Sequence, residues 1–286
     1  MTLTIADRRD AFRALHERGC FVLPNPWDVG SARLLESLGF KALATTSSGH
    51  AWSIGQADGA VSREATLAHM RAMVEATALP VNADFESGFA DSADGVAESV
   101  RMAIATGVAG LSIEDSTGDP NDPLRALDDA VARMRAARAA IDAAGGDTLL
   151  VGRAENFFVG RPDFDDTLRR LKAYAAAGAD CLYAPGIRSR EQIAAVVAAV
   201  APKPVNLLIG SASEFTVADV AALGVRRISV GGALARAAWG GFLRAARAIA
   251  DGGRFDGLAD AASGQQLNAL FGTPSKALPD STRAAS

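Results

Sequence analysis

The sequence predicts a single (β/α)8 TIM barrel, and three regularities support this fold class. Eight short apolar runs alternate with longer helical segments, and eight is the strand number of a closed barrel of this type. Glycines lie where the helices should end, as expected for helix C-caps. The 286 residues are close to the ~250 of such a barrel, so we expect one domain over residues 1–271. The polar residues 272–286 are expected to form a flexible tail.

The predicted strands are short, and several are almost continuously apolar, which is typical of strands buried on both faces of a parallel sheet. They are Cys20–Pro24, Ala42–Thr46, Val81–Asp84, Gly110–Glu114, Leu149–Arg153, Cys181–Ala184, Val205–Ile209 and Arg227–Val230. Segments rich in Ala, Leu, Arg and Glu predict helices between them. These are Arg63–Thr77, Ala93–Thr106, Leu124–Ala144, Asp163–Ala177 and Arg190–Val200.

Two further segments follow the eighth predicted strand. Ala233–Ala250 predicts a long helix, and Phe255–Phe271 an additional segment. A helix added to a complete barrel must cover something, so we expect it to pack on its own barrel or on a neighbouring subunit.

Composition narrows the class of partner. The net charge of −4 and the pI of 5.5 argue against a nucleic-acid partner, which would require a basic surface, and leave a small molecule. No apolar run approaches the ~20 residues that span a bilayer, and the N-terminal residues do not resemble a signal peptide. Cys20 and Cys181 lie in apolar runs and form no disulfide or metal motif. We therefore expect a soluble, cytoplasmic protein.

Acidic residues gather where the predicted strands end. Asp84 and Glu86 end the third strand, Glu114 ends the fourth, and Asp58 follows the second. Chemistry in such barrels lies at this end, and neighbouring strands are ~4.8 Å apart, so these carboxylates should converge. Converging carboxylates repel one another unless they are protonated or bridged by a cation. Oxygen ligands favour Mg²⁺, whereas three histidines are too few for a histidine-rich transition-metal site.

An arginine follows on the next strand. Arg153 could clamp a substrate carboxylate with two parallel hydrogen bonds, or it could pair with Glu155 or Glu114. Asn206 adds a polar group on the seventh strand.

The loop after the second strand could bind an oxyanion. Backbone amides and hydroxyl groups lie together in its sequence Ser47, Ser48, Gly49 and His50. His50 could also donate a proton, although a single loop histidine more often only packs.

Taken in order, several motifs resemble the isocitrate lyase/phosphoenolpyruvate mutase superfamily over about residues 5–250. The matching stretches begin with Asn25-Pro26-Trp27-Asp28-Val29-Gly30-Ser31, Thr45–Gly49, Gly55-Gln56-Ala57-Asp58-Gly59 and Asp84-Phe85-Glu86-Ser87-Gly88-Phe89. They continue with Ile113-Glu114-Asp115, Gly152-Arg153-Ala154-Glu155, Tyr183-Ala184-Pro185-Gly186 and Lys203-Pro204-Val205-Asn206.

This resemblance implies a cofactor, a substrate class and an assembly. It implies Mg²⁺ or Mn²⁺ held directly by Asp84, with Asp58, Glu86 and Glu114 acting largely through water. It implies a 2-oxo acid or its enolate bound by the metal, by the main chain of Ser48, Gly49 and His50, and by Arg153. It also implies a last helix that is exchanged between subunits, giving homodimers or homotetramers.

The segment that selects the reaction departs from the family pattern. Lyases of the superfamily carry a Lys-Arg/Lys-Cys-Gly motif on the loop after the fourth strand, whereas residues Ser116–Pro123 contain neither lysine nor cysteine. The lid sequence of the phosphonate mutases is also absent, and Ala184-Pro185 replaces the histidine that follows their sixth strand. The acid/base candidates are then Tyr183, His50 and Glu155.

Three hypotheses follow from these motifs. The first is an enzyme, a Mg²⁺- or Mn²⁺-dependent lyase or hydrolase that cleaves a C–C bond of a small 2-oxo or 2-hydroxy carboxylate through an enolate-like intermediate. The second is a mutase or hydrolase of phosphonopyruvate-type P–C bonds, with Gly210-Ser211 and Gly231-Gly232 as a phosphate cradle. The third is a non-catalytic metabolite-binding protein with a degenerate lid.

Overall fold

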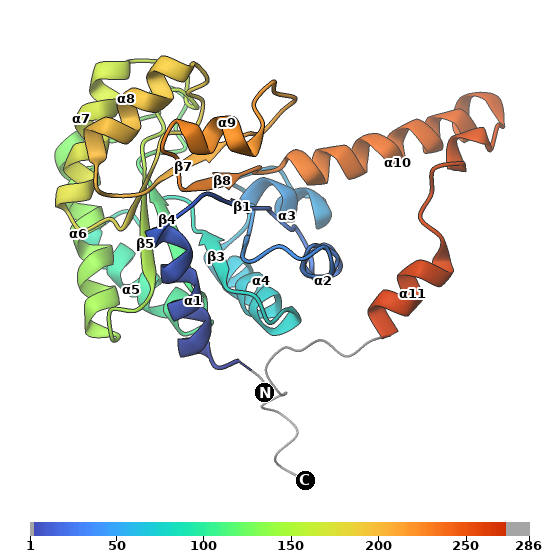
Figure 1. Cartoon of the computed structure of the whole chain (residues 1–286), viewed down its shortest axis with the longest axis horizontal. Coiled ribbons are helices and arrows are strands. Elements are labelled where there is room, and N and C mark those ends of the chain that lie inside the picture. The colour runs from blue at the N-terminus through green and yellow to red at the C-terminus, as the bar shows by residue number, and fades with distance from the viewer. Residues whose placement is uncertain (1–2, 273–286) are drawn as a thin grey trace, which may run out of the picture.

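The computed structural model describes residues 3–272 and places eight parallel strands in a nearly closed barrel surrounded by helices (Figure 1). The strands are β1 (Phe21–Leu23), β2 (Leu43–Ala44), β3 (Val81–Asp84), β4 (Gly110–Glu114), β5 (Leu149–Arg153), β6 (Cys181–Tyr183), β7 (Val205–Leu208) and β8 (Arg227–Ser229). They pair in the order β1-β8-β7-β6-β5-β4-β3-β2. A backbone hydrogen bond of 3.1 Å from Ala44 to the Pro24 carbonyl links β2 to the end of β1. The predicted (β/α)8 TIM barrel is therefore confirmed.

The helices follow the strands with few exceptions. They are α1 (Ile5–Glu17), α2 (Val29–Ser37), α3 (Ser47–Ser53), α4 (Arg63–Ala76), α5 (Ala93–Ile104), α6 (Leu127–Ala143), α7 (Phe164–Ala176), α8 (Arg190–Val200), α9 (Val217–Ala222), α10 (Ala233–Gly252), the 3-10 turn η1 (Asp256–Leu258) and α11 (Gly264–Gly272). Ser62, Ser92 and Ser189 cap α4, α5 and α8 by accepting a backbone hydrogen bond, which explains where these helices begin.

Helix α1 covers the N-terminal end of the barrel. Phe12 is fully buried among residues at the strand starts, including Ala109 and Leu149. Arg9 donates to the carbonyls of Val108 (3.0 Å) and Ile104 (3.1 Å), so a charged side chain fastens α1 to the end of α5 and the residues before β4. This end of the barrel is thereby sealed.

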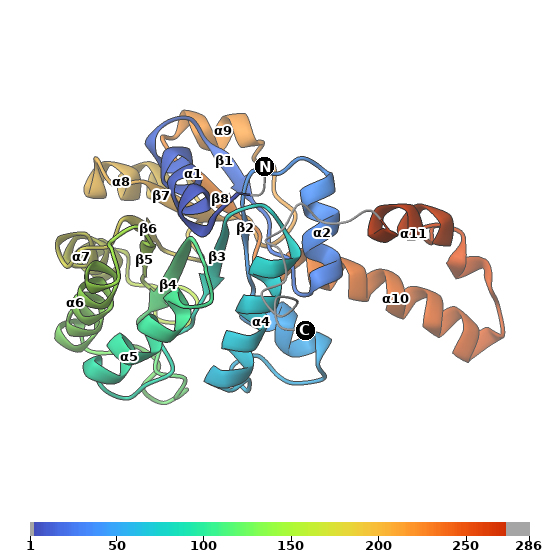
Figure 2. The same ribbon diagram turned by 90° about the horizontal axis from the view of Figure 1, so that it is seen from below.

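Helix α10 leads away from the barrel, and α11 returns beside α2 (Figures 1 and 2). A hydrogen bond of 3.2 Å from Arg33 to the Phe271 carbonyl joins α11 to α2. Within α10 only Ala235 is buried, while Trp239 and Phe242 are 39% and 60% exposed. The expected flexible tail lies outside the described residues except for Gly272, which ends α11. No helix among residues 3–272 is long and apolar enough to cross a membrane.

Candidate active site

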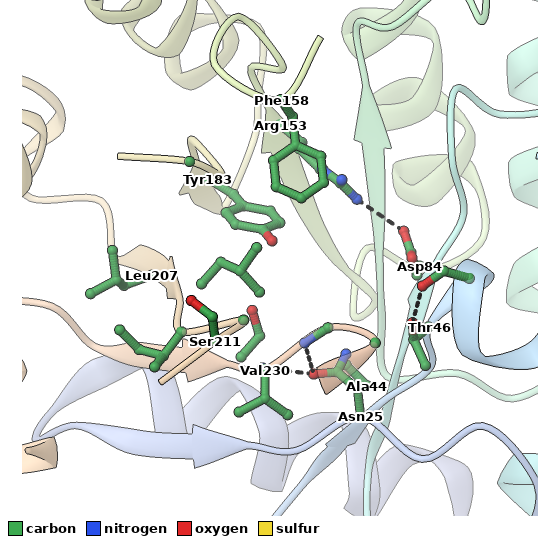
Figure 3. A pocket seen from close by; sticks show the side chains of 18 of the residues that line it. Asn25, Ala44, Thr46, Asp84, Arg153, Phe158, Tyr183, Leu207, Ser211 and Val230 are labelled. Carbon is green, nitrogen blue, oxygen red and sulfur yellow. Dashed lines mark hydrogen bonds and ion pairs between the residues drawn. The ribbon is translucent and has the colours of Figure 1, made fainter. Parts of the chain in front are cut away.

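A cavity of about 580 Å³ opens at the C-terminal ends of the strands (Figure 3). Its polar lining includes Asp84 of β3, Arg153 of β5 and Tyr183 of β6. Parallel register explains part of this grouping, because Glu114 of β4 pairs with Arg153, which in turn pairs with Tyr183. Side chains of in-register residues in neighbouring parallel strands point to the same face, here toward the barrel interior.

Arg153 is the electrostatic centre of the site. Its Nη1 lies 3.2 Å from Asp84 Oδ1 and 3.1 Å from Glu114 Oε2, and its Nε contacts Glu155. Burial alone would lower the pKa of Arg153, but the surrounding acids, led by Glu114 and Glu155, raise that pKa well above its ordinary value. The guanidinium therefore stays charged and offsets part of the negative charge of this cluster.

Four acids near Arg153 have raised pKa values: Asp58, Glu86, Glu114 and Glu155. Burial raises the pKa of Glu86 to about 8, with further increases from Asp84, Glu114 and Asp58. Burial also raises the pKa of Glu114 and, against the opposing effect of Arg153, that of Glu155. The pKa of Asp58 is raised by burial and by Asp84. Such a cluster is short of positive charge.

Two local features hold Asp84 in place. Its backbone amide donates to Thr45 Oγ1 at 2.8 Å, and its Oδ2 accepts from the backbone amide of Ser47 at 3.0 Å. Ser47 is the first residue of α3. One backbone amide of the segment that was expected to bind an oxyanion therefore donates its hydrogen bond to Asp84. Ser47 and Ser48 line the cavity, whereas Gly49 does not and packs against Thr46 and Trp27.

His50 does not line the cavity. Its ring stacks on His69 of α4, with centroids 3.7 Å apart and planes 15° from parallel. Burial lowers the pKa of both rings, to about 3 for His69, so both are neutral near pH 7. This geometry favours the packing interpretation of His50 over a role as proton donor or substrate ligand.

Of the remaining predicted residues, Tyr183 reaches the cavity and Asn206 does not. The Arg153 guanidinium lies 5.1 Å from the centre of the Tyr183 ring. Burial raises the pKa of Tyr183 to about 12. The Asn206 amide instead donates to Ser229 Oγ at 2.9 Å and accepts from Arg227 Nε at 2.8 Å. Glu155 is also buried behind Arg153, outside the lining.

Sequence reasoning missed several lining residues. Asn82, Ser112 and Arg227 lie deeper in the barrel than the strand ends. Asn82 and Ser112 stand two positions before Asp84 and Glu114, and this period of two within strands was the signal that could have found them. Arg227 lies within hydrogen-bonding distance of Asn206 and Asn82, and its guanidinium lies 5.9 Å from the ring of Phe12.

A buried network behind the site joins β4, β5 and α7. Asp115 Oδ1 accepts from the Glu155 backbone amide at 2.8 Å, and its Oδ2 accepts from Arg170 at 3.1 Å and from the Tyr174 hydroxyl. Asp115 is therefore a structural anchor that fixes the strand end next to Arg153.

The donor set fits a hydrated divalent cation better than a closed metal site. Asp58 and Asp84 are the acids that line the cavity, and Glu86 and Glu114 stand behind them. Among residues 3–272, no three His, Cys, Asp or Glu side chains converge as a ligand cluster. Mg²⁺ commonly takes one or two carboxylates directly and keeps several waters, so these residues suit it.

These features define a (β/α)8 barrel with a charged site at the C-terminal ends of its strands, where Asp84, Glu114 and Glu155 surround Arg153. Residues 12–250 match the family model described as phosphoenolpyruvate phosphomutase. The chain belongs to the phosphoenolpyruvate mutase family, and the resemblance found in the motifs is confirmed.

Three similar proteins illustrate the family. A Burkholderia cenocepacia J2315 protein, described as a candidate lyase/mutase, is 49% identical, with a TM-score of 0.92 over 96% of this chain and 99% of that one. The oxaloacetate decarboxylase of Bradyrhizobium diazoefficiens is 32% identical over 74% of each chain. The structure of an oxaloacetate acetylhydrolase in complex with the product oxalate is 27% identical, with a TM-score of 0.83 over 93% of this chain and 94% of that one.

Proposed function

We propose that this chain is a Mg²⁺- or Mn²⁺-dependent lyase that cleaves a C–C bond of a small 2-oxo or 2-hydroxy carboxylate. The observation that carries the proposal is the contact of Arg153 with Asp84 and Glu114 at the wall of a deep cavity. Similarity to an oxaloacetate decarboxylase and to an oxaloacetate acetylhydrolase supports the same substrate class.

Different residues would bind the metal and the substrate. Asp84 would hold the metal, with Asp58 beside it and Glu86 and Glu114 acting through water. A bound Mg²⁺ would supply the Lewis acidity that stabilises negative charge on an enolate oxygen. Arg153 would bind the substrate carboxylate by charge-assisted hydrogen bonds. Ser47 and Ser48 line the same wall.

Tyr183 is the proton donor that the geometry favours. Its hydroxyl is protonated near pH 7, as in any tyrosine, and burial raises its pKa further, to about 12. The side chain lines the cavity. With oxaloacetate, the C3–C4 bond would break, CO₂ would leave, and the electron pair would form the enolate of pyruvate. Tyr183 would then give its proton to C3 and recover a proton from solvent.

The test combines activity with metal binding. We expect oxaloacetate or a substituted malate to be cleaved with Mg²⁺ or Mn²⁺ and not after chelation. Asp84→Ala should lose Mn²⁺ binding in calorimetry, and Tyr183→Phe should lose turnover while still binding oxalate. Tyr174→Phe, the same change away from the cavity, should retain turnover. Parent-like Mn²⁺ binding by Asp84→Ala would show that the site assignment is wrong.

The P–C bond reaction remains the second candidate, because Gly210, Ser211, Gly231 and Gly232 all line the cavity. Phosphorus NMR of phosphonopyruvate mixed with the protein tests it directly. Binding of oxalate with no turnover of any of these compounds would instead favour a non-catalytic binding protein.

We also propose a cytoplasmic homodimer or homotetramer in which the subunits exchange the long C-terminal helix α10. The exposed Trp239 and Phe242 support an apolar contact between subunits, and the two free cysteines suit a reducing compartment.

A further inference from the structure

The cavity has two chemically different sides (Figure 3). Asp58, Asp84 and Arg153 belong to the side formed by β2 to β5 and its loops. Leu207 of β7 and Ser211 in the loop after β7 lie across the cavity from Asp84 in Figure 3. Apart from Asp58 and Asp84, no carboxylate lines the cavity in the described chain.

The side formed by β7 and β8 carries an apolar strip among polar residues, which are Ser211, Ser213, Ser229, Arg227 and Arg236. Its partly exposed wall consists of Leu208, Ile209, Phe215 and Val230, backed by the buried Ile193 and Leu207. We call this the apolar arm. Ser211 and Arg236 line its rim, and the Arg236 guanidinium donates to the Gly210 carbonyl. An apolar wall that remains partly exposed in a cavity is typical of a surface that a ligand covers.

The volume supports the same conclusion. Oxaloacetate has nine non-hydrogen atoms. Even at the ~30 Å³ that a whole water molecule takes in the liquid, nine such atoms would fill at most ~270 Å³. The cavity measures about 580 Å³, so oxaloacetate alone would leave more than half of it to the metal and to water.

We infer that the substrate carries an apolar substituent, which occupies the apolar arm while its 2-oxo or 2-hydroxy acid end lies at Asp84 and Arg153. This inference rests on the proposed function, and it narrows the substrate to a class larger than oxaloacetate. A second carboxylate would lose its hydration against Leu208, Phe215 and Val230, whereas one placed beside Arg188 or Arg236 would be paired.

A homologous series tests the inference without requiring turnover. Dissociation constants are measured by calorimetry with Mg²⁺ for pyruvate, 2-oxobutyrate, 2-oxopentanoate, 2-oxohexanoate and 2-oxoheptanoate. Burying one methylene is worth about fourfold in affinity, so we expect the affinity to rise by roughly this factor per carbon until the arm is full. A flat series with metal-dependent pyruvate binding would overturn the inference and leave the proposed function standing. Absence of binding by every member would overturn both.

Matched variants locate the effect. Ser211→Trp places an indole at the rim of the arm and should abolish the gain per carbon. Glu214→Trp makes the same kind of change in the same loop, at an exposed residue outside the lining, and should preserve the gain. An equal gain in both variants would contradict the assignment of the arm. Tighter binding of 2-oxoadipate than of 2-oxohexanoate would identify the arm as an anion subsite and also overturn it.

Discussion

The buried hydroxyl of Tyr174 offers a quantitative test of the network behind the site. Tyr174 is fully buried on α7 and donates to Asp115, which also accepts from Arg170 and from the Glu155 backbone amide. Tyr174→Phe removes one hydrogen bond to a charged group and leaves the ring in place. Such a bond is worth about 1.5–3 kcal/mol, and the carboxylate keeps two other donors. We therefore expect the free energy of unfolding to fall by about 2 kcal/mol.

Urea unfolding followed by circular dichroism measures this loss, with the slope of the transition unchanged from the parent. Tyr183→Phe is the matched control. It should cost less than about 1 kcal/mol, because its hydroxyl faces a cavity that water can enter. A loss below about 0.5 kcal/mol for Tyr174→Phe would refute the reasoning, since it would mean that the hydroxyl does not stabilise the Asp115 carboxylate. If the stability losses of Tyr174→Phe and Asp115→Asn simply add in the double variant, the two side chains do not interact, which would also refute the reasoning.

Three further predictions concern other parts of the chain. Burial lowers the pKa of His16 to about 3, so below about pH 6.5 the unfolded chain binds a proton that the folded chain does not bind. The free energy of unfolding should therefore fall toward pH 3 by up to about 1.4 kcal/mol per pH unit. His16→Phe should reduce this pH dependence in denaturant titrations between pH 6.5 and 5, and an unchanged dependence would contradict the prediction. Gly110→Ala places a methyl group 2.8 Å from Phe12 and 3.2 Å from the Leu149 carbonyl, and should lower the free energy of unfolding by about 1–3 kcal/mol. Gly264→Ala is the control, because no atom lies within 4 Å of the added methyl group, and it should leave the free energy of unfolding unchanged. Phe242→Asp should shift the mass measured by light scattering from an oligomer to a monomer, and a monomeric parent chain would exclude the exchange of α10.

The barrel was predictable because short, largely apolar runs alternate with helical segments along the chain. All eight strands fall inside the predicted ranges, although β2 spans only Leu43–Ala44 where Ala42–Thr46 was expected. The segment Ser47–Ser53 was interpreted as a loop and is a helix. Its serines and glycine have weak helix propensity, but the N-cap hydrogen bond of Thr46 and the burial of Ala51 stabilise the helix.

The convergence of acids at the strand ends was also predictable, but the direction of each side chain was not. Strand alternation places Asp84 and Glu86 on one face, yet Glu86 follows the end of β3 and adopts a positive φ of 48°, so it turns out of the strand geometry. His50 was ambiguous because its partner His69 lies 19 positions later, on a helix whose packing no local pattern reveals.

The seal that α1 forms has a consequence for the order of events in a cleavage reaction. Phe12 and Arg9 close one end of the barrel, so the substrate must enter, and both product fragments must leave, through the cavity opening at the other end. The product fragment nearer the opening then has to dissociate before the fragment bound deeper in the cavity. Inhibition by the deeper fragment should therefore be competitive with substrate, and inhibition by the outer fragment should be noncompetitive.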